Sequence, residues 1–324
     1  MGSLDKEVAT ELLPFVRVYK DGSVERLQGS PIVPSCLEDP DTGVSSKDIT
    51  ILDNPPISAR LYLPKDTQPD QKLPVLVYFH GGGFLFESAF SLTETKYMNS
   101  LVSLAKVVAI SIEYRLAPEY PLPIAHEDCW AGLQWVASQS TNDGKEKESW
   151  VKDHGDFERF FIGGDSAGAN IAHNMALRAG TEGLHGGVKI LGTYLTHPYF
   201  WSSKPVGDEE KREEPEKLAL CPLVWGFVYP SAPGGIDNPM VNPVAPGAPS
   251  LAGLGCSRLL VSVAKDDVLR DRGVWYCDAV KESGWKGEVE LIQVEGEDHA
   301  FHILNYGTEN ANNLIQCLAS FLSE

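Results

Sequence analysis

Residues 160–170 read FFIGGDSAGAN, a serine between glycines directly after an apolar run. The stretch from Gly164 to Gly168 fits the pattern G-x-S-x-G, which is typical of a sharp turn from a strand into a helix. The strand and the helix approach each other closely in such a turn, so the flanking residues must be small and the serine backbone is strained. We therefore predict that Ser166 presents its hydroxyl as a nucleophile at the end of a strand, although a serine that only caps a helix would also fit.

Strand-like and helix-like segments alternate on both sides of this turn. Apolar runs predict strands at 59–63, 74–79, 107–114, 159–163, 188–195, 258–264 and 289–294. Helices are predicted at about 94–105, 124–139, 168–179, 271–283 and 309–322. This alternation predicts an α/β fold, in which helices flank a mostly parallel central sheet. The length allows one large domain or two small ones. Residues 1–50 and about 200–250 have weak periodicity, and we expect them to form loops or a cap over the sheet.

A glycine-rich loop follows an earlier apolar run. His80 is followed by Gly81, Gly82 and Gly83, and consecutive glycines leave backbone N–H groups uncovered. The HGGG pattern is typical of the oxyanion-hole loop of esterases and lipases. A merely flexible glycine loop is the alternative, but the G-x-S-x-G turn downstream argues against it. We expect the N–H groups of Gly82, Gly83 and Ala167 to stabilise an oxyanion.

A serine nucleophile needs a base, and eight histidines are available. His299 lies in GEDHAF, after the strand-like VELIQV and before the last helix, as the chain order serine, acid, histidine requires. His302, three residues further on, is the main alternative to His299, but we expect it to belong to the next secondary-structure element. His80 is expected to support the glycine loop, and two more lie within predicted helices, His126 and His173. The remaining three have no motif around them: His154, His185 and His197. His299 is the predicted base.

The acid that orients this histidine is expected in a loop after a strand that lies between the serine and the histidine in the chain. The apolar run RLLVSVA leads directly into KDDVLRD, which contains Asp266, Asp267 and Asp271. Strand position does not decide among these three aspartates.

Charge and composition limit the kinds of molecule that the protein is expected to bind. The formal charge of -18 disfavours nucleic acid and anionic membranes and favours neutral or cationic small molecules. No apolar run approaches the ~20 residues of a membrane helix, and MGSLDKEVATELL lacks the features of a secretory signal. We therefore expect a cytoplasmic protein. Separately, we expect it to be a monomer or a weak dimer. No CxxC, HExxH or EF-hand pattern is present, so we predict neither a metal nor an organic cofactor.

Four motifs together resemble those of plant carboxylesterases of the hormone-sensitive-lipase-like branch of α/β-hydrolases: HGGGF, YRLAPE, GDSAGAN and D-x-L-x-D. The likeness extends over nearly the whole chain. It implies a single domain over 1–324 with an α/β-hydrolase fold and an amino-terminal helical cap, to which about 1–50 and 200–250 would contribute. It also implies that Asp267, the first aspartate of D-x-L-x-D, is the acid of a catalytic triad. Asp271 then becomes a residue at a helix start and Asp266 an exposed neighbour.

Three further segments resemble the 2-hydroxyisoflavanone dehydratase-like carboxylesterases: ELLPFVRVYKDGSVERL, DPDTGVSSKDI and APGAPSLAGLGCSRLLV. Relatives of that subgroup include cyclases of monoterpene indole alkaloid pathways. Some of its dehydratases carry threonine at the nucleophile position and some cyclases have lost triad members, whereas Ser166, Asp267 and His299 are all present here. The resemblance implies a carboxylesterase for small plant metabolite esters. One alternative is a dehydratase or cyclase on the same scaffold. Another is a ligand-binding protein similar to the gibberellin receptors, although those receptors replace the triad histidine.

Overall fold

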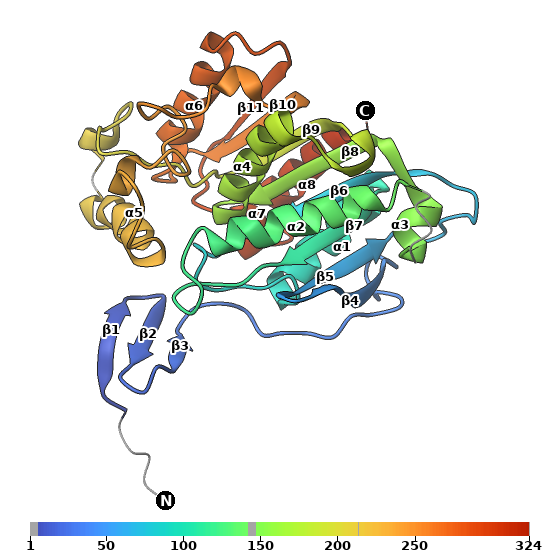
Figure 1. The fold of residues 1–324 in the computed structure, drawn as a ribbon, viewed down its shortest axis with the longest axis horizontal. Helices are drawn as coiled ribbons and strands as arrows, with labels where there is room; N and C mark the ends of the chain where they lie inside the picture. Colours follow the sequence, from blue (N-terminus) through green and yellow to red (C-terminus); the bar gives the residue numbers. More distant parts are fainter. Residues whose placement is uncertain (1–5, 142–146, 213, 324) are drawn as a thin grey trace, which may run out of the picture.

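The seven apolar runs of the sequence form seven of the eight strands of one sheet in the computed structural model, which describes residues 6–141, 147–212 and 214–323 (Figure 1). The strands lie in the order β11-β10-β9-β8-β6-β7-β5-β4. Their bounds are β4 (Ser45–Asp53), β5 (Pro56–Leu63), β6 (Leu73–Phe79), β7 (Val108–Glu113), β8 (Gly155–Asp165), β9 (Ile190–Thr196), β10 (Cys256–Ala264) and β11 (Glu288–Val294). Strands β6 to β11 all run parallel to one another, and β5 and β4 complete one edge, with β5 antiparallel to β7 and β4 antiparallel to β5. The mostly parallel sheet is thus confirmed.

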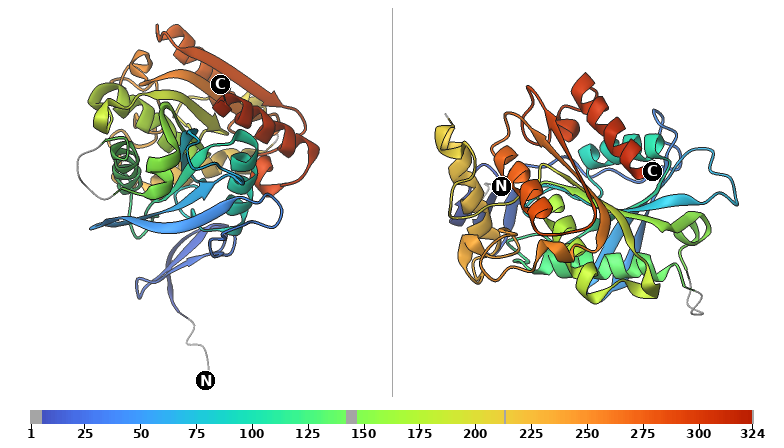
Figure 2. Two further views of the ribbon diagram at one scale, coloured as in Figure 1. Left: turned by 90° about the vertical axis from the view of Figure 1, so that its right-hand side faces the viewer. Right: turned by 90° about the horizontal axis from the view of Figure 1, so that it is seen from above.

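Helices cover both faces of the sheet, which explains why all seven residues of β6 are buried. On one face α1 (Leu92–Ala105) and α8 (Glu309–Ser323) lie side by side, with the short α7 (Phe301–Leu304) next to them (Figure 2). On the other face lie α2 (Ile124–Ser138), α4 (Ala167–Glu182) and α6 (Arg270–Glu282). The five predicted helices are all present. Within the described residues, three α-helices were not predicted: α3 (Ser149–His154), α5 (Pro215–Val228) and the short α7.

The amino-terminal segment corrects one expectation. Its resemblance implied a helical cap, but the described residues before 27 form a three-stranded antiparallel sheet of β1 (Val8–Leu12), β2 (Val16–Tyr19) and β3 (Val24–Arg26). Asp21 and Gly22 explain the difference, because Asp-Gly between two short apolar runs favours a tight hairpin turn. Gly22 has the positive φ of 83° that such a turn uses. β4, also within the first 50 residues, belongs to the main sheet.

The small amino-terminal sheet is fastened beside the glycine-rich loop. Arg26 of β3 donates hydrogen bonds to the backbone oxygen of Leu85 at 2.8 Å and to the Glu119 carboxylate at 2.9 Å. β1 also packs against α5, and both lie at the end of the molecule opposite α3 (Figure 1). Segments far apart in the sequence therefore meet over the ends of the parallel strands.

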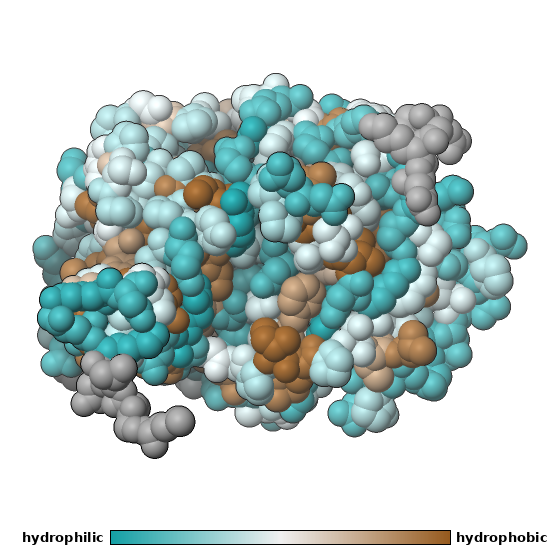
Figure 3. Space-filling view, turned by 60° about the horizontal axis from the view of Figure 1, so that its bottom comes forward, coloured by the Kyte–Doolittle hydropathy of each residue, from teal (hydrophilic) through white to brown (hydrophobic). Residues whose placement is uncertain are grey.

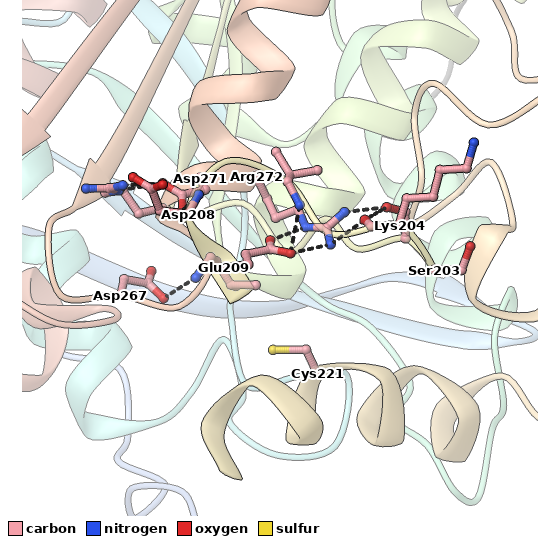
Figure 4. A network of polar contacts seen from close by, with 12 residues as sticks. Ser203, Lys204, Asp208, Glu209, Cys221, Asp267, Asp271 and Arg272 are labelled. Atoms are coloured by element: carbon pink, nitrogen blue, oxygen red, sulfur yellow. Dashed lines mark hydrogen bonds and ion pairs between the residues drawn. The ribbon is translucent and has the colours of Figure 1, made fainter. Parts of the chain in front are cut away.

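A buried ion pair anchors the segment between β9 and α5 (Figure 4). Arg272 of α6 contacts the Glu209 carboxylate at 2.7 Å, and both side chains are almost fully buried. The guanidinium also donates to the backbone oxygen of Lys204 at 3.0 Å and lies 4.5 Å from the ring centroid of Trp201. Every charged group in this contact has a partner, so the arrangement holds the chain that leads into α5.

Replacing Arg272 with methionine should therefore be strongly destabilising. The change leaves the Glu209 carboxylate buried without its counter-charge, and breaking such a pair costs about 3–5 kcal/mol of unfolding free energy. Urea unfolding of Arg272→Met beside the wild type measures the loss. Lys211→Met is the control, because Lys211 and its partner Asp208 are largely exposed and should change the midpoint little. Equal midpoints for wild type and Arg272→Met would contradict this account of the anchor.

The outer surface is mixed in character. On the face shown in Figure 3, hydrophobic residues form small patches separated by hydrophilic ones. Within the described ranges, we find no helix that is both long and apolar enough to cross a membrane.

Candidate active site

Ser166 lies on the turn between β8 and α4, at the carboxyl end of the central strands. Its backbone has φ 53° and ψ -111°, a strained conformation for a residue with a side chain. A Cβ atom on Gly164 would lie 2.3 Å from the backbone of Gly168, and one on Gly168 would lie 1.9 Å from the backbone oxygen of Phe79. The two glycines are therefore required because strand, helix and the neighbouring strand are in direct contact here.

The glycine-rich loop begins where β6 ends, next to this turn. Gly82 and Gly83 have φ of 94° and 60°, and a Cβ on Gly82 would lie 2.1 Å from the backbone oxygen of Phe86. His80 supports the loop from below: its ring stacks on Tyr114 at 4.2 Å, and burial lowers the pKa of His80 to about 4. A neutral, buried His80 matches the structural part expected for it.

His299 and Asp267 meet Ser166 from two separate loops. His299 follows β11, and its Nε2 lies 2.9 Å from the Ser166 Oγ. Its Nδ1 lies 2.8 Å from Oδ2 of Asp267, in the loop after β10. The other carboxylate oxygen of Asp267 accepts a hydrogen bond from the backbone N–H of Leu269 at 2.9 Å. The three side chains thus form a continuous chain of contacts from hydroxyl to carboxylate.

The rival residues lie elsewhere. Asp266 is exposed, and Asp271 lies in the first turn of α6, where its carboxylate contacts Arg270. His302 is fully buried in α7, with its Nε2 3.8 Å from Oδ1 of Asp165.

Electrostatics within the contact chain favour an ionised Asp267 beside a protonated His299. Burial raises the pKa of Asp267, but His299 and His197 outweigh it and hold that pKa well below its usual range. Burial likewise lowers the pKa of His299, but Asp267, with smaller contributions from Asp165 and Asp298, raises it to about 9. The Asp267 carboxylate therefore holds a proton firmly on the His299 ring.

A cavity of about 750 Å³ opens onto Ser166, with Gly82, Gly83 and His299 in its wall. Most of the wall is apolar and comes from distant segments: Phe15, Leu85, Phe86, Leu220, Val224 and Phe301. Glu94 also lines it and accepts a hydrogen bond from Tyr78 at 3.0 Å. Burial, together with the charge of Asp165, raises the pKa of Glu94 well above its ordinary value, so this carboxyl keeps its proton more readily than an exposed one.

Two residues near Ser166 were not singled out from the sequence. Asp165 and His197 are buried behind the turn, where the ligand atoms of Asp165, His197 and His302 lie within 4.8 Å of one another. Such a set could hold a metal ion, as could His197 with Asp267 and His299, although the last two are already bonded to each other. A histidine at the carboxyl end of a parallel strand was the available signal for His197.

Comparison with known proteins gives the family. Residues 76–303 match the family model described as alpha/beta hydrolase fold. A 2-hydroxyisoflavanone dehydratase from Glycyrrhiza echinata is 58% identical over 319 residues, 98% of this chain and 97% of that protein. Probable carboxylesterase 2 from Arabidopsis thaliana is 43% identical over 324 residues, 100% and 99% of the two chains.

Solved structures agree with this assignment. A hyperthermophilic esterase from the archaeon Pyrobaculum calidifontis superposes with a TM-score of 0.70 and 29% identity, covering 86% of this chain and 85% of that one. The parallel sheet, the strained serine turn and these likenesses lead to one conclusion: the chain belongs to the α/β-hydrolase family.

Proposed function

We propose that this protein is a carboxylesterase that works by two-step acyl transfer. Ser166 attacks the ester carbonyl while His299 takes its proton, and Asp267 keeps His299 in the tautomer that can accept it. The proton then passes to the leaving alcohol, and water activated by the same histidine releases the acid. The observation that carries the proposal is the unbroken contact chain, 2.9 Å from Ser166 to His299 and 2.8 Å from His299 to Asp267.

The glycine-rich loop would stabilise the negative charge that develops on the carbonyl oxygen. We assign this part to the backbone N–H groups of Gly82, Gly83 and Ala167, the first residue of α4, where the helix end adds a partial positive charge. Gly82, Gly83 and Ser166 line the same cavity, which supports the assignment.

The cavity favours a neutral substrate with a sizeable apolar part, such as an ester of a small plant metabolite. Lys217 is a cation in its wall, and it is already paired with Glu214 at 2.7 Å and Asp298 at 2.9 Å. A free carboxylate on the substrate would have to compete with both partners. Glu94, whose pKa is raised by burial, offers the substrate a polar contact in its protonated form without adding charge.

A second candidate function is a dehydratase, favoured by the 58% identity to the Glycyrrhiza echinata protein of that name. The His299–Asp267 pair would then remove a proton from carbon, and the glycine-rich loop would stabilise the enolate, without an acyl-enzyme. The presence of serine at position 166 places ester hydrolysis first, because lyase chemistry of this kind needs no nucleophile.

Pre-steady-state kinetics with p-nitrophenyl acetate test the proposal. An esterase is expected to release a burst of p-nitrophenol close to the enzyme concentration, followed by a slower steady rate, or else fast steady turnover if deacylation is rapid. The dehydratase reading predicts loss of water from a 2-hydroxyisoflavanone without ester turnover. Release of p-nitrophenol no faster than with heat-denatured protein would refute the esterase.

Replacing Gly82 with alanine tests the glycine-rich loop. The added Cβ meets the Phe86 oxygen and sits on a backbone with φ of 94°, so the loop must shift and misplace its N–H groups. We expect kcat to fall by about 10²- to 10³-fold, as for loss of one oxyanion donor. Gly183→Ala is the matched control, with φ of 74° but nothing within 4 Å of its Cβ. Full activity in well-folded Gly82→Ala would remove Gly82 from the mechanism.

The pH profile follows from the raised pKa of His299. Only the neutral imidazole can accept the serine proton, so a pKa raised toward about 9 means that kcat/KM should still be rising above neutral pH. The profile of p-nitrophenyl acetate hydrolysis, corrected for the spontaneous rate, measures this limb. A plateau already reached below about pH 6 would contradict the raised pKa.

A further inference from the structure

His197 occupies a position that demands an explanation. It follows β9 directly, with φ of 48°, and its N–H donates to the backbone oxygen of Ser262 in β10 at 2.8 Å. The imidazole is fully buried, and within the described residues neither ring nitrogen makes a well-aligned hydrogen bond. A buried polar group without a well-aligned hydrogen bond costs free energy, so its position calls for an explanation.

The group it faces is the acid of the proposed triad. His197 Nδ1 lies 3.3 Å from Oδ2 of Asp267, the same oxygen that His299 contacts at 2.8 Å. The backbone N–H of Leu269 donates a hydrogen bond to the other oxygen, Oδ1 of Asp267. Three nitrogens thus lie close to the buried carboxylate, two of them at one oxygen, and the longer of these two contacts belongs to His197.

The surroundings of His197 contain two acids and two other imidazoles. Asp267 and Asp165 approach from the ends of β10 and β8, and Asp298 adds its charge near His299. The His299 ring lies 5.5 Å from that of His197, and the His302 ring stacks on it at 5.4 Å. Burial, with smaller contributions from the other two histidines, holds the pKa of His302 well below its ordinary value. His302 is therefore neutral, and it adds no charge of its own.

We propose that His197 is a positioning residue for the triad: its Nδ1–H holds Oδ2 of Asp267 in place and shares the negative charge of that oxygen with His299. The inference rests on the proposed acyl-transfer function. The carboxylate then attracts the His299 proton less strongly than an otherwise free carboxylate would, and it stays in register when His299 becomes charged during the reaction.

His197→Phe removes the donor and keeps a ring of similar size against Phe301, whose ring centroid lies 5.5 Å from that of His197. Asp267 then pulls harder on the His299 proton, so the acid limb of kcat/KM should move to higher pH. Loss of register should also lower kcat, by up to about 100-fold for a misplacement on the order of 1 Å. KM should change little, because His197 lies behind the cavity wall.

Two variants separate this from simple packing. His197→Asn places an amide N–H where Nδ1 was, and it should restore the limb and most of kcat. His173→Asn is the matched control, since His173 is an equally buried imidazole whose Nδ1 lies 2.8 Å from the Tyr276 hydroxyl, away from Asp267. The acid limb of the kcat/KM profile of His173→Asn should coincide with that of the wild type.

NMR titration of the His299 ring gives the same comparison without turnover, so it remains informative even if the esterase proposal fails. A higher His299 pKa in His197→Phe, with recovery in His197→Asn, is the expected result. An unchanged His299 titration in folded His197→Phe, or equal impairment of the Phe and Asn variants, would overturn the assignment and leave His197 as a packing residue. Absence of ester turnover in the wild type would refute the proposed function alone.

Discussion

Replacing Ser166 with alanine should lower kcat/KM for p-nitrophenyl acetate by about 10⁴- to 10⁶-fold, the scale seen when a triad nucleophile is removed. Without the hydroxyl, no acyl-enzyme forms, and only weak assistance from the oxyanion loop and from binding remains. The fold should persist, because Ser166 contributes its strained backbone and not a side-chain cap to the start of α4. Initial rates at several ester concentrations measure the loss.

Ser320→Ala, on the exposed side of α8, is the control and should match the wild type. A Ser166→Ala protein that keeps more than about a tenth of the rate would exclude the acyl-enzyme route. If the same variant still removed water from a 2-hydroxyisoflavanone, the dehydratase would become the leading function.

Replacing Asp267 with asparagine should be nearly as damaging, lowering kcat by about 10⁴-fold with intact geometry. The carboxylate accepts the Nδ1 proton of His299, whereas an amide in its place can turn its own N–H toward Nδ1 and so stabilise the wrong tautomer. His299 then presents a proton, not a lone pair, to Ser166. The pH profile of the remaining activity should also lose its high-pH rise, because the charge that raises the His299 pKa is gone.

Asp266→Asn is a matched control for this variant, since it alters the preceding, exposed residue of the same loop. It should keep nearly all activity. A severe loss in Asp266→Asn together with a mild one in Asp267→Asn would show that the acid had been assigned to the wrong aspartate.

Patterns within a few residues were enough to predict most of the fold. The strands of the parallel sheet are continuous apolar runs because both of their faces are covered, and such runs are visible without a structure. β4 was missed because it is an edge strand in which polar residues such as Ser45, Lys47 and Asp48 break the apolar run. α5 was missed because a charged run precedes it and Pro222 lies inside it.

The candidate site was predictable in part for the same reason. Ser166 and the glycine-rich loop carry their geometry in adjacent residues, since the close contacts that require glycine are local. The choice of Asp267 over its neighbours depended on family resemblance, because three aspartates share one loop. The position of His197 at the end of a strand was visible in the sequence, but its proposed role was not, since that role depends on Asp267 and His299, which approach from two other strands.

The central claim is that Ser166 is an activated nucleophile, and intact-protein mass spectrometry after brief exposure to a fluorophosphonate tests it most directly. The account predicts one adduct per chain, located by peptide mapping at Ser166 and absent from Ser166→Ala. No adduct on correctly folded wild-type protein, or an adduct that persists in Ser166→Ala, would contradict it.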